Sequence, residues 1–541
     1  MEEEMVLDGS RRKAYRVYVL FSVFVVLLAA SLRSYHIAKR SLWLDEAIAA
    51  NISRGTLSET LILTRGLHSA PILDPLILYA VERVGSGPLA VRMPSLVASV
   101  LAVLLMLCFV TIPSIEYKTA GLSALMVSMS AAQIRYAQEV REYSLSVLYA
   151  GVLLYAFLSY LSKKEEDNSP IPLYLALFFA PLVQYGLVLL SFGVLAALLV
   201  LVFTGTKRGR GITQIMAASG FLALGGLLSF FLTLRYQWGD DTWYLKDYFY
   251  APGENVLHFI SYNTHHLVTF LLPGLAAASI SVLAISIYLI ASFRKRIMPP
   301  LAVLACTSIG IVLLCSLLHL YPYGRIRQCL FLTPVLCLLA SESLVRVANR
   351  FTGRANSLVF IVIVCVVVVS GAYQIRLEKP YAEVEDIQQV LLSLQSKIQP
   401  GDDVYIYPPA VFAVDYYLKE RDRRFIYGDY HQKAPEKYVP EMLAGLDPGT
   451  DRLWIVFSHI YRDEDQRILH DLSKEWKVKP ALSVTGSALY LATHRSDVTG
   501  AEPTNARNAA VEASKTTPIV DHTHGSFWDW NIRNISRYPA Q

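Results

Sequence analysis

Long apolar runs recur along most of the chain and limit what it can fold into. A helix needs roughly 20 apolar residues to cross the hydrocarbon core of a bilayer, and about eleven segments approach that length. They cover approximately residues 17–33, 90–112, 119–135, 144–162, 171–184, 186–205, 213–235, 266–293, 299–320, 328–346 and 357–376. Because 54% of the 541 residues are hydrophobic and 17% are charged, we expect a mainly α-helical, polytopic membrane protein.

The positive charges lie in short clusters between the apolar runs. The net charge of +5 is small for this length, and no basic stripe or patch points to nucleic acid. With eleven spans and an internal N-terminus, every inside segment is basic, as the positive-inside bias requires. These segments contain Arg11, Arg12, Lys13 and Arg16; Lys118; Lys163 and Lys164; Lys207, Arg208 and Arg210; Arg294, Lys295 and Arg296; Arg346, Arg350 and Arg354. The sequence therefore predicts an N-in, C-out topology.

The composition divides the chain into three parts. Residues 1–379 are expected to form a transmembrane domain, with a first outer loop at 34–89. In residues 380–495 short apolar runs alternate with helical patterns: helices are expected near 384–398, 410–418 and 464–476, and strands near 404–407, 453–457 and 488–492. This alternation indicates a small extracytoplasmic α/β domain. Residues 496–541 are polar and lack periodicity, so a disordered tail is expected.

Two carboxylates follow Trp43, soon after the first apolar run. Asp45 or Glu46 could act as a general base on an incoming hydroxyl or amine, since partial desolvation at an interface raises a carboxyl pKa toward neutrality. The same pair could instead cap a helix that starts near Ala47, because negative charge is favourable at a helix N-terminus. The spacing supports both interpretations equally, and one acid can cap while the other catalyses.

A second part of the first outer loop holds His68 and Asp74. His68 could bind a phosphate or a metal, although a lone loop histidine is more often simply solvated. Asp74 precedes Pro75, which favours a helix start, so Asp74 could cap that helix or point into a site.

Two further clusters lie at the predicted outer ends of later spans. The first cluster contains Arg92, Glu139, Arg141 and Tyr143. Glu139 and Tyr143 are four residues apart, so they would share one face of a helix. A purely structural role is the alternative, in which Glu139 forms an ion pair with Arg135. The second cluster contains Tyr323, Arg325 and Arg327. Two positive charges at an interface suit a lipid phosphate or pyrophosphate, and snorkelling would also place them there.

Taken in order, these motifs resemble the GT-C-type glycosyltransferases. The resemblance rests on Trp-x-Asp-Glu-Ala at 43–47, His-x-x-Pro at 68–71, Arg-x-Pro-Ser at 92–95, Gln-Glu-x-Arg-x-Tyr at 138–143, Tyr-Gly-x-x-Arg at 323–327 and Pro-Gly-Asp-Asp-Val-Tyr at 400–405. The most similar groups are the bacterial relatives of dolichyl-phosphate-mannose protein mannosyltransferases and the aminoarabinose lipid A transferases. The usual His-Pro-Pro-Leu-Tyr pattern is altered here, with an insertion after His68 and Asp74-Pro75 in its middle.

The resemblance implies transfer of a sugar from a polyprenyl-phosphate donor to a glycan, lipid or protein acceptor on the outer face, with inversion. It assigns Asp45 as the catalytic acid with Glu46 as its companion, and makes Asp74 a candidate second acid. We expect eight further candidates to bind substrate: His68, Arg92, Glu139, Arg141, Tyr143, Tyr323, Arg325 and Arg327. No metal ligands are assigned, and the need for a divalent metal cofactor is left open.

Two other classes of protein compete with this interpretation. A transporter or flippase for lipid-linked saccharides would also have about eleven spans, but it predicts charged groups near the middle of the bilayer. A non-catalytic subunit that binds partners through its outer domain is the third class. We expect an enzyme in a bacterial cytoplasmic membrane.

Overall fold

The computed structural model describes residues 2–67, 69–162, 169–204, 211–237, 243–251, 253–296, 298–418, 425–428, 437–447 and 449–494. The chain divides into two compact units. The helical unit consists of Met1–Ile37, Ser69–Ile77 and Arg92–Tyr381, and the sheet unit consists of Ala38–His68, Leu78–Val91 and Ala382–Gln541. Most of the predicted outer loop, residues 38–68 and 78–89, therefore folds with the C-terminal part of the chain. The tail predicted at 496–541 lies outside the described residues.

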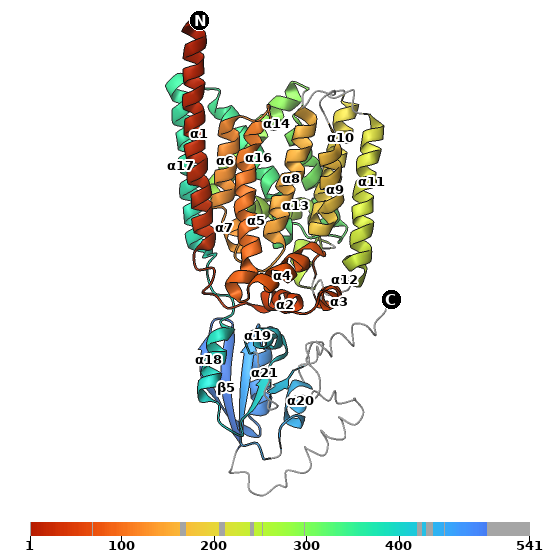
Figure 1. Ribbon diagram of the computed structural model, residues 1–541, viewed down its shortest axis with the longest axis vertical. Coiled ribbons are helices and arrows are strands. Elements are labelled where there is room, and N and C mark those ends of the chain that lie inside the picture. The colour runs from red at the N-terminus through yellow and green to blue at the C-terminus, as the bar shows by residue number, and fades with distance from the viewer. Residues whose placement is uncertain are drawn as a thin grey trace. The chain divides into compact units, whose positions relative to one another are not determined.

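The helical unit is a bundle of long helices that lie side by side (Figure 1). Its longer helices are α1 (Glu2–Ser34), α5 (Pro88–Cys108), α6 (Tyr117–Met129), α8 (Tyr143–Ser162), α9 (Ile171–Val183), α10 (Gly186–Phe203), α11 (Ile212–Ser229), α13 (Val256–Leu271), α14 (Leu275–Arg294), α15 (Pro300–Leu317), α16 (Thr333–Ala348) and α17 (Gly353–Glu378). Short helical elements join them: η1 (Phe109–Thr111), α7 (Ala131–Tyr136), η2 (Phe230–Leu234), α12 (Arg235–Gln237), η3 (Trp243–Tyr248) and η4 (Arg327–Leu332). The first residues of α5 and the last residues of α4 (Leu73–Val84) belong to the sheet unit.

Nine helices among the described residues are long and apolar enough to span a membrane. Nine of the predicted runs correspond to them, and the polytopic helical fold class is confirmed. The other two runs are shorter than predicted. Residues 119–135 form α6 and α7, because Ser130 adopts an extended backbone conformation between them. Residues 171–184 form only the 13-residue α9, which ends where Gln184 becomes extended.

The span predicted at 266–293 is also interrupted. Helix α13 ends at Leu271, and α14 begins at Leu275. Leu272 precedes a proline and is extended, as residues before proline tend to be. Gly274 then has a φ of +85°, a conformation that residues with a Cβ rarely adopt. The apolar run is therefore continuous in composition but not in backbone conformation.

Helix α16 is the centre of the bundle. It packs against α6, α8, α14, α15 and α17, and 89% of its most apolar stretch is buried. At two helix contacts around it a glycine allows close approach. A Cβ on Gly225 of α11 would lie 1.9 Å from the Phe178 carbonyl oxygen of α9, and a Cβ on Gly193 of α10 would lie 2.2 Å from the Ser308 hydroxyl oxygen of α15. Small residues at such contacts are common in membrane bundles, where packing drives helix association.

The sheet unit contains a five-stranded sheet in the order β2-β1-β3-β5-β4. Its elements are α2 (Leu44–Arg54), α3 (Leu57–Leu67), α18 (Ile387–Lys397), β1 (Asp403–Ile406), η5 (Pro408–Ala410), α19 (Val411–Tyr417), β2 (Phe425–Tyr427), α20 (Tyr438–Ala444), β3 (Arg452–Ser458), α21 (Glu464–Leu472), β4 (Trp476–Val484) and β5 (Ser487–His494). Strands β1, β2 and β3 are parallel, whereas β5 is antiparallel to β3 and to β4. Strand β3 is buried almost throughout, as expected for a central strand covered on both faces.

The predicted helices and strands of residues 380–495 all occur, but both edge strands, β2 and β4, and the short helix α20 were missed. The helix expected over 464–476 ends at Leu472, and Trp476 already begins β4. Strand β4 carries lysines, contains Pro480 and has a register shift beside it. These are features of an edge strand that limit further strand pairing, and they hide the apolar alternation that would identify a strand.

Candidate functional site

The two acids after Trp43 lie in the first turn of α2. The Glu46 carboxylate accepts a hydrogen bond from the Trp43 backbone N–H at 3.4 Å, and Glu46 is only 1% exposed. Glu46 therefore caps the helix, which is one of the two roles that the sequence allowed. Asp45, one residue earlier, is partly exposed. Of the pair, Asp45 is the acid that a substrate could reach.

The start of α2 is fixed by a glutamate that sequence reasoning missed. Glu385, only 3% exposed, accepts hydrogen bonds from the Leu44 backbone N–H at 3.1 Å and from the Ser458 hydroxyl at 3.3 Å. Its other carboxylate oxygen lies 2.5 Å from Nδ1 of His459, whose ring stacks on Trp43 with centroids 6.2 Å apart. Glu385 thus ties the backbone next to Asp45 to the end of β3.

Helix α2 is also held further along its length. The side-chain amide of Asn51 donates to the Phe412 carbonyl at 2.7 Å. Arg54 donates to the Tyr416 carbonyl at 3.0 Å and lies 3.8 Å from the centre of the Tyr416 ring. Both contacts are with the helix α19, so the segment that carries Asp45 packs on the C-terminal part of the sheet unit at both of its ends.

A second group of candidates meets at the junction of α7 and α8 in the helical unit. Residues 137–142 form a loop, so the expected shared helix face of Glu139 and Tyr143 is wrong. The alternative ion pair is present: Nε of Arg135 lies 3.2 Å from the Glu139 carboxylate, which is buried. The rings of Tyr136 and Tyr143 meet edge to face, 5.4 Å apart.

Two arginines from distant parts of the chain lie near the Tyr143 ring. The Arg141 guanidinium lies 5.8 Å and the Arg327 guanidinium 5.5 Å from its centre. Arg141 is also 3.5 Å from the Glu142 carboxylate, and its carbonyl accepts a hydrogen bond from Ser95 at 3.1 Å. The structure therefore brings together three of the motifs, those at 92–95, 138–143 and 323–327.

Arg325 does not join Arg327 at this position. The two side chains have different partners: Arg327 lies near the Tyr143 ring, whereas Arg325 contacts other residues. Arg325 pairs with Glu378 of α17 at 3.0 Å and lies 6.0 Å from the Phe270 ring. Its side chain remains about half exposed.

Arg92 and Tyr323 are buried in the packing of the helical unit. Arg92 is fully buried and donates to the Ile37 carbonyl at 2.8 Å. The Tyr323 hydroxyl lies 2.8 Å from that of Thr264, and its backbone N–H donates to the Tyr248 carbonyl at 3.0 Å. Burial raises the pKa of Tyr323 to about 12. These contacts hold the backbone beside the two arginine motifs in place.

The remaining candidates come from the predicted first outer loop. Asp74 is buried in the first turn of α4, within the stretch that belongs to the helical unit. His68 lies outside the described residues. In the part of the chain that the structure describes, no group of three or more His, Cys, Asp or Glu side chains is arranged to hold a metal ion.

A second buried arginine was also missed by sequence reasoning. Arg33, at the end of α1, is fully buried and donates to the Ser99 hydroxyl at 2.7 Å and to the Val127 carbonyl at 2.9 Å. The side chain of Gln138 donates to the Arg33 carbonyl at 2.9 Å. The signal for this role was an arginine directly after an apolar run, since an arginine within the hydrocarbon region needs internal partners.

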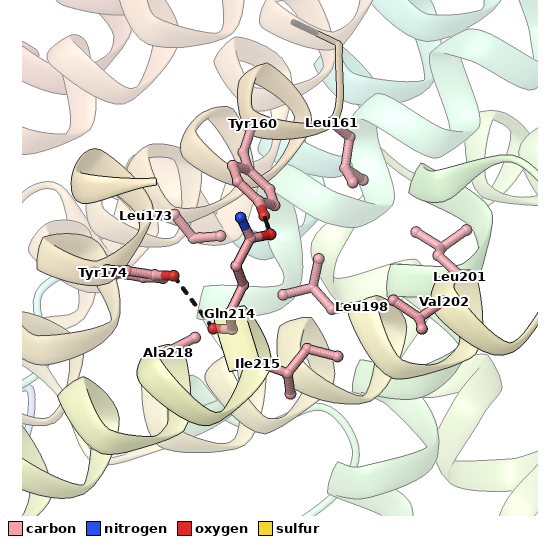
Figure 2. Close-up of a pocket in the computed structure, with 10 residues that line it drawn as sticks. All are labelled: Tyr160, Leu161, Leu173, Tyr174, Leu198, Leu201, Val202, Gln214, Ile215 and Ala218. Atoms are coloured by element: carbon pink, nitrogen blue, oxygen red, sulfur yellow. Dashed lines mark hydrogen bonds between the residues drawn. The ribbon is translucent and has the colours of Figure 1, made fainter. Parts of the chain in front are cut away.

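One small cavity can be set aside as a substrate site (Figure 2). It lies among α8, α9, α10 and α11, and its volume is about 10 Å³. Inside it the Tyr160 hydroxyl bonds to the side-chain oxygen of Gln214 at 2.5 Å, and the Tyr174 hydroxyl donates to the Gln214 carbonyl at 3.3 Å (Figure 2). A space of this size holds at most about one water molecule.

The helical bundle with a small α/β unit confirms the fold class that the sequence predicted. Sequence comparison with protein-family models and with curated proteins finds no match. Among solved structures, the chain is similar to ArnT from Cupriavidus metallidurans in the apo state, with a TM-score of 0.55 and 13% identity over 88% of this chain and 98% of that chain. A structure of ArnT from the same organism bound to undecaprenyl phosphate gives a TM-score of 0.51 and 12% identity, again over 88% of this chain and 98% of that chain.

Proposed function

We propose that this protein is a membrane glycosyltransferase that transfers a sugar from a polyprenyl-phosphate donor to a glycan, lipid or protein acceptor. The observation that carries the proposal is the ArnT fold, which extends over 88% of the chain. One of the similar ArnT structures holds undecaprenyl phosphate, which is the phosphate-bearing lipid of such a donor. The partly exposed acid at position 45 and the paired arginines beside Tyr143 provide the two chemical groups that this reaction needs.

In this mechanism Asp45 is the general base. Its carboxylate accepts the proton of the acceptor hydroxyl or amine as that oxygen or nitrogen attacks the anomeric carbon of the sugar. The bond from that carbon to the phosphate oxygen breaks, and the polyprenyl phosphate leaves with the bonding electron pair. A single displacement inverts the anomeric configuration and needs no covalent intermediate.

The leaving phosphate gains negative charge as the bond breaks. Arg141 and Arg327, both within 6 Å of the centre of the Tyr143 ring, are proposed to stabilise this charge, because fixed cations act strongly in a site shielded from water. Arg325 is assigned to donor binding, because its guanidinium remains half exposed next to Phe270. Asp74 is proposed as a second acid, with Arg92, Glu139 and Tyr323 supporting the backbone of the arginine motifs, and His68 as a substrate contact.

The proposed location follows from the basic clusters between the spans. They lie on the inside of a bacterial cytoplasmic membrane under the N-in, C-out topology. The sheet unit then faces the outside, and transfer occurs on that face.

The test is an activity assay on purified protein reconstituted in liposomes. Synthetic polyprenyl-phosphate sugars and a membrane extract are supplied, and labelled acceptors are identified by mass spectrometry. Asp45→Asn is expected to lower turnover by about 10²- to 10⁴-fold, the usual contribution of a general base, while melting temperature and donor binding stay unchanged. Unaltered turnover would remove Asp45 from the mechanism. Donor movement across the liposome without product would favour a transporter instead.

Arg327→Gln is the matched test of phosphate binding, with Arg325→Gln beside it. Loss of Arg327 is expected to reduce kcat, because the negative charge that Arg327 stabilises develops on the leaving phosphate only in the transition state. Loss of Arg325 is expected mainly to raise the KM for the donor. If both variants retain the kinetics of the unmodified enzyme, the phosphate must be bound by other groups.

A further inference from the structure

A cavity of about 650 Å³ lies in the helical unit among the end of α14, the start of α15 and the end of α16. Three cationic side chains line it: Lys295, Arg346 and Arg350. Glu116 is the acid among its lining residues, which leaves an excess of positive charge. The volume is within the range of about 300–1,000 Å³ that small-molecule sites occupy.

Two of these cations are available for a ligand. Arg346 already pairs with Glu342 at 2.7 Å, and Glu116 accepts hydrogen bonds from the Asn349 side chain at 3.1 Å. Within the described ranges, the side chains of Lys295 and Arg350 form no ion pair or hydrogen bond. An anion entering the cavity therefore meets two unpaired positive charges and need not break an existing contact.

The stretch of α14 that lines the cavity is mostly apolar. Ala284, Ile287 and Ala291 recur at helical spacing along this stretch and form its apolar lining, with Val347 of α16 contributing as well. The Tyr288 ring, which also lines the cavity, lies 4.8 Å from the Arg346 guanidinium and separates charged from apolar surface. The cavity is thus cationic at the helix ends and apolar along the spans, which matches an amphiphile with an anionic head.

This cavity is distinct from the candidate site beside Tyr143. The span that ends in Ala348 begins at Arg327 and contains 22 residues, so its two ends lie about 30 Å apart at 1.5 Å per residue. Arg327 belongs to the candidate site, whereas Arg346 lines the cavity near the other end. Basic pockets between spans on the cytoplasmic side are typical binding sites for anionic lipid head groups.

We infer that this cavity binds an anionic glycerophospholipid. Its phosphate lies between Lys295 and Arg350, and one acyl chain follows the apolar wall of α14. The inference does not rest on the proposed transferase function, since none of the residues assigned to catalysis lines the cavity. It concerns the lipid environment in which the protein is stable.

The experiment compares lipid binding by two double variants of the full chain. Lys295→Gln with Arg350→Gln removes both available cations. Arg294→Gln with Arg354→Gln is the matched control, because it removes the same charge from exposed neighbouring positions that do not line the cavity. Size-exclusion chromatography and circular dichroism establish that both variants are folded.

Bound lipid is counted by native mass spectrometry after addition of dioleoylphosphatidylglycerol, dioleoylphosphatidylcholine or inorganic phosphate. Phosphatidylglycerol is expected to bind the unmodified protein and the Arg294→Gln, Arg354→Gln control with equal affinity. Its affinity for the Lys295→Gln, Arg350→Gln variant should be about 25-fold lower, since each cation near an anionic lipid contributes roughly a factor of five in affinity. Phosphatidylcholine should bind weakly to all three proteins. Equal binding of phosphatidylglycerol to both double variants would overturn the inference. If inorganic phosphate displaces phosphatidylglycerol at a concentration equal to that of the lipid, the cavity recognises phosphate alone, and the assignment to a lipid is overturned.

Discussion

Replacing Glu385 by alanine should release the start of α2 without unfolding the protein. Three donors lose their acceptor, but they are not affected equally. The Ser458 hydroxyl retains Ser487 at 2.9 Å, and the His459 side chain is 27% exposed and can bond to water. The Leu44 N–H is buried and is left without a partner. One unsatisfied buried donor costs about 1–3 kcal/mol and one lost charge-assisted bond about 1.5–3 kcal/mol, so we expect a local destabilisation of about 3 kcal/mol.

Hydrogen–deuterium exchange measures this change directly. A loss of about 3 kcal/mol corresponds to roughly 100-fold faster exchange in the peptide covering Leu44–Arg54, whereas peptides from α16 should be unchanged. Glu475→Ala is the control, because this glutamate is exposed in the same unit. If transfer depends on Asp45, the Glu385 variant should lose kcat more than donor affinity, and Glu385→Gln should recover part of it. Unchanged exchange in the α2 peptide would refute the reasoning.

Three further predictions concern stability. Gly225→Ala should lower the melting temperature relative to Gly226→Ala, because a Cβ on Gly225 would be 1.9 Å from the Phe178 carbonyl oxygen, whereas a Cβ on Gly226 would meet nothing within 4 Å. Overpacking of this kind costs about 1–3 kcal/mol of folding stability. Equal melting temperatures of the two variants would contradict the close helix contact. Arg33→Lys should destabilise the protein by about 2 kcal/mol or more in denaturant titrations, since one ammonium cannot replace the guanidinium fork; an unchanged midpoint would show that these bonds contribute little. Burial raises the pKa of the Glu82 carboxyl despite Arg54 and Arg83 nearby, so the protonated form of Glu82 stabilises the folded protein and this stability is lost as the pH rises through the folded-state pKa. The melting temperature of Glu82→Gln should therefore rise relative to that of the unmodified protein between pH 4.5 and pH 7.5. Melting temperatures that change in parallel with pH would count against a raised pKa.

The long spans were predictable from the sequence because their signal is the total apolar length. The interruptions were not, since they depend on backbone conformation at single positions. Gly274 and Ser130 leave the hydropathy almost unchanged, yet each lies in a break between two helices. In the sheet unit the buried central strands were found, whereas β4 was missed because an edge strand carries polar residues and a proline.

The candidate site shows a similar division. The sequence placed Arg141 and Arg327 in separate clusters, whereas both approach the Tyr143 ring in the structure. The partners of individual side chains were not predictable, because they depend on the tertiary fold: Arg325 pairs with Glu378 and does not join Arg327. Glu385 could not have been identified at all, since its partners Leu44, Ser458 and His459 are 341, 73 and 74 positions away in the chain and only the fold joins them.

The bond between Leu44 and Glu385 joins residues that are 341 positions apart in the chain. At a synthesis rate of about 5–20 residues per second, the ribosome needs roughly 20–70 s to make the intervening chain. During that time Ile48 and Ile52, which are buried in the finished protein, have no core to cover them. The earliest segment of the sheet unit is thus among the last to mature, and a chain released before its final strands would lack the residues on which this segment packs.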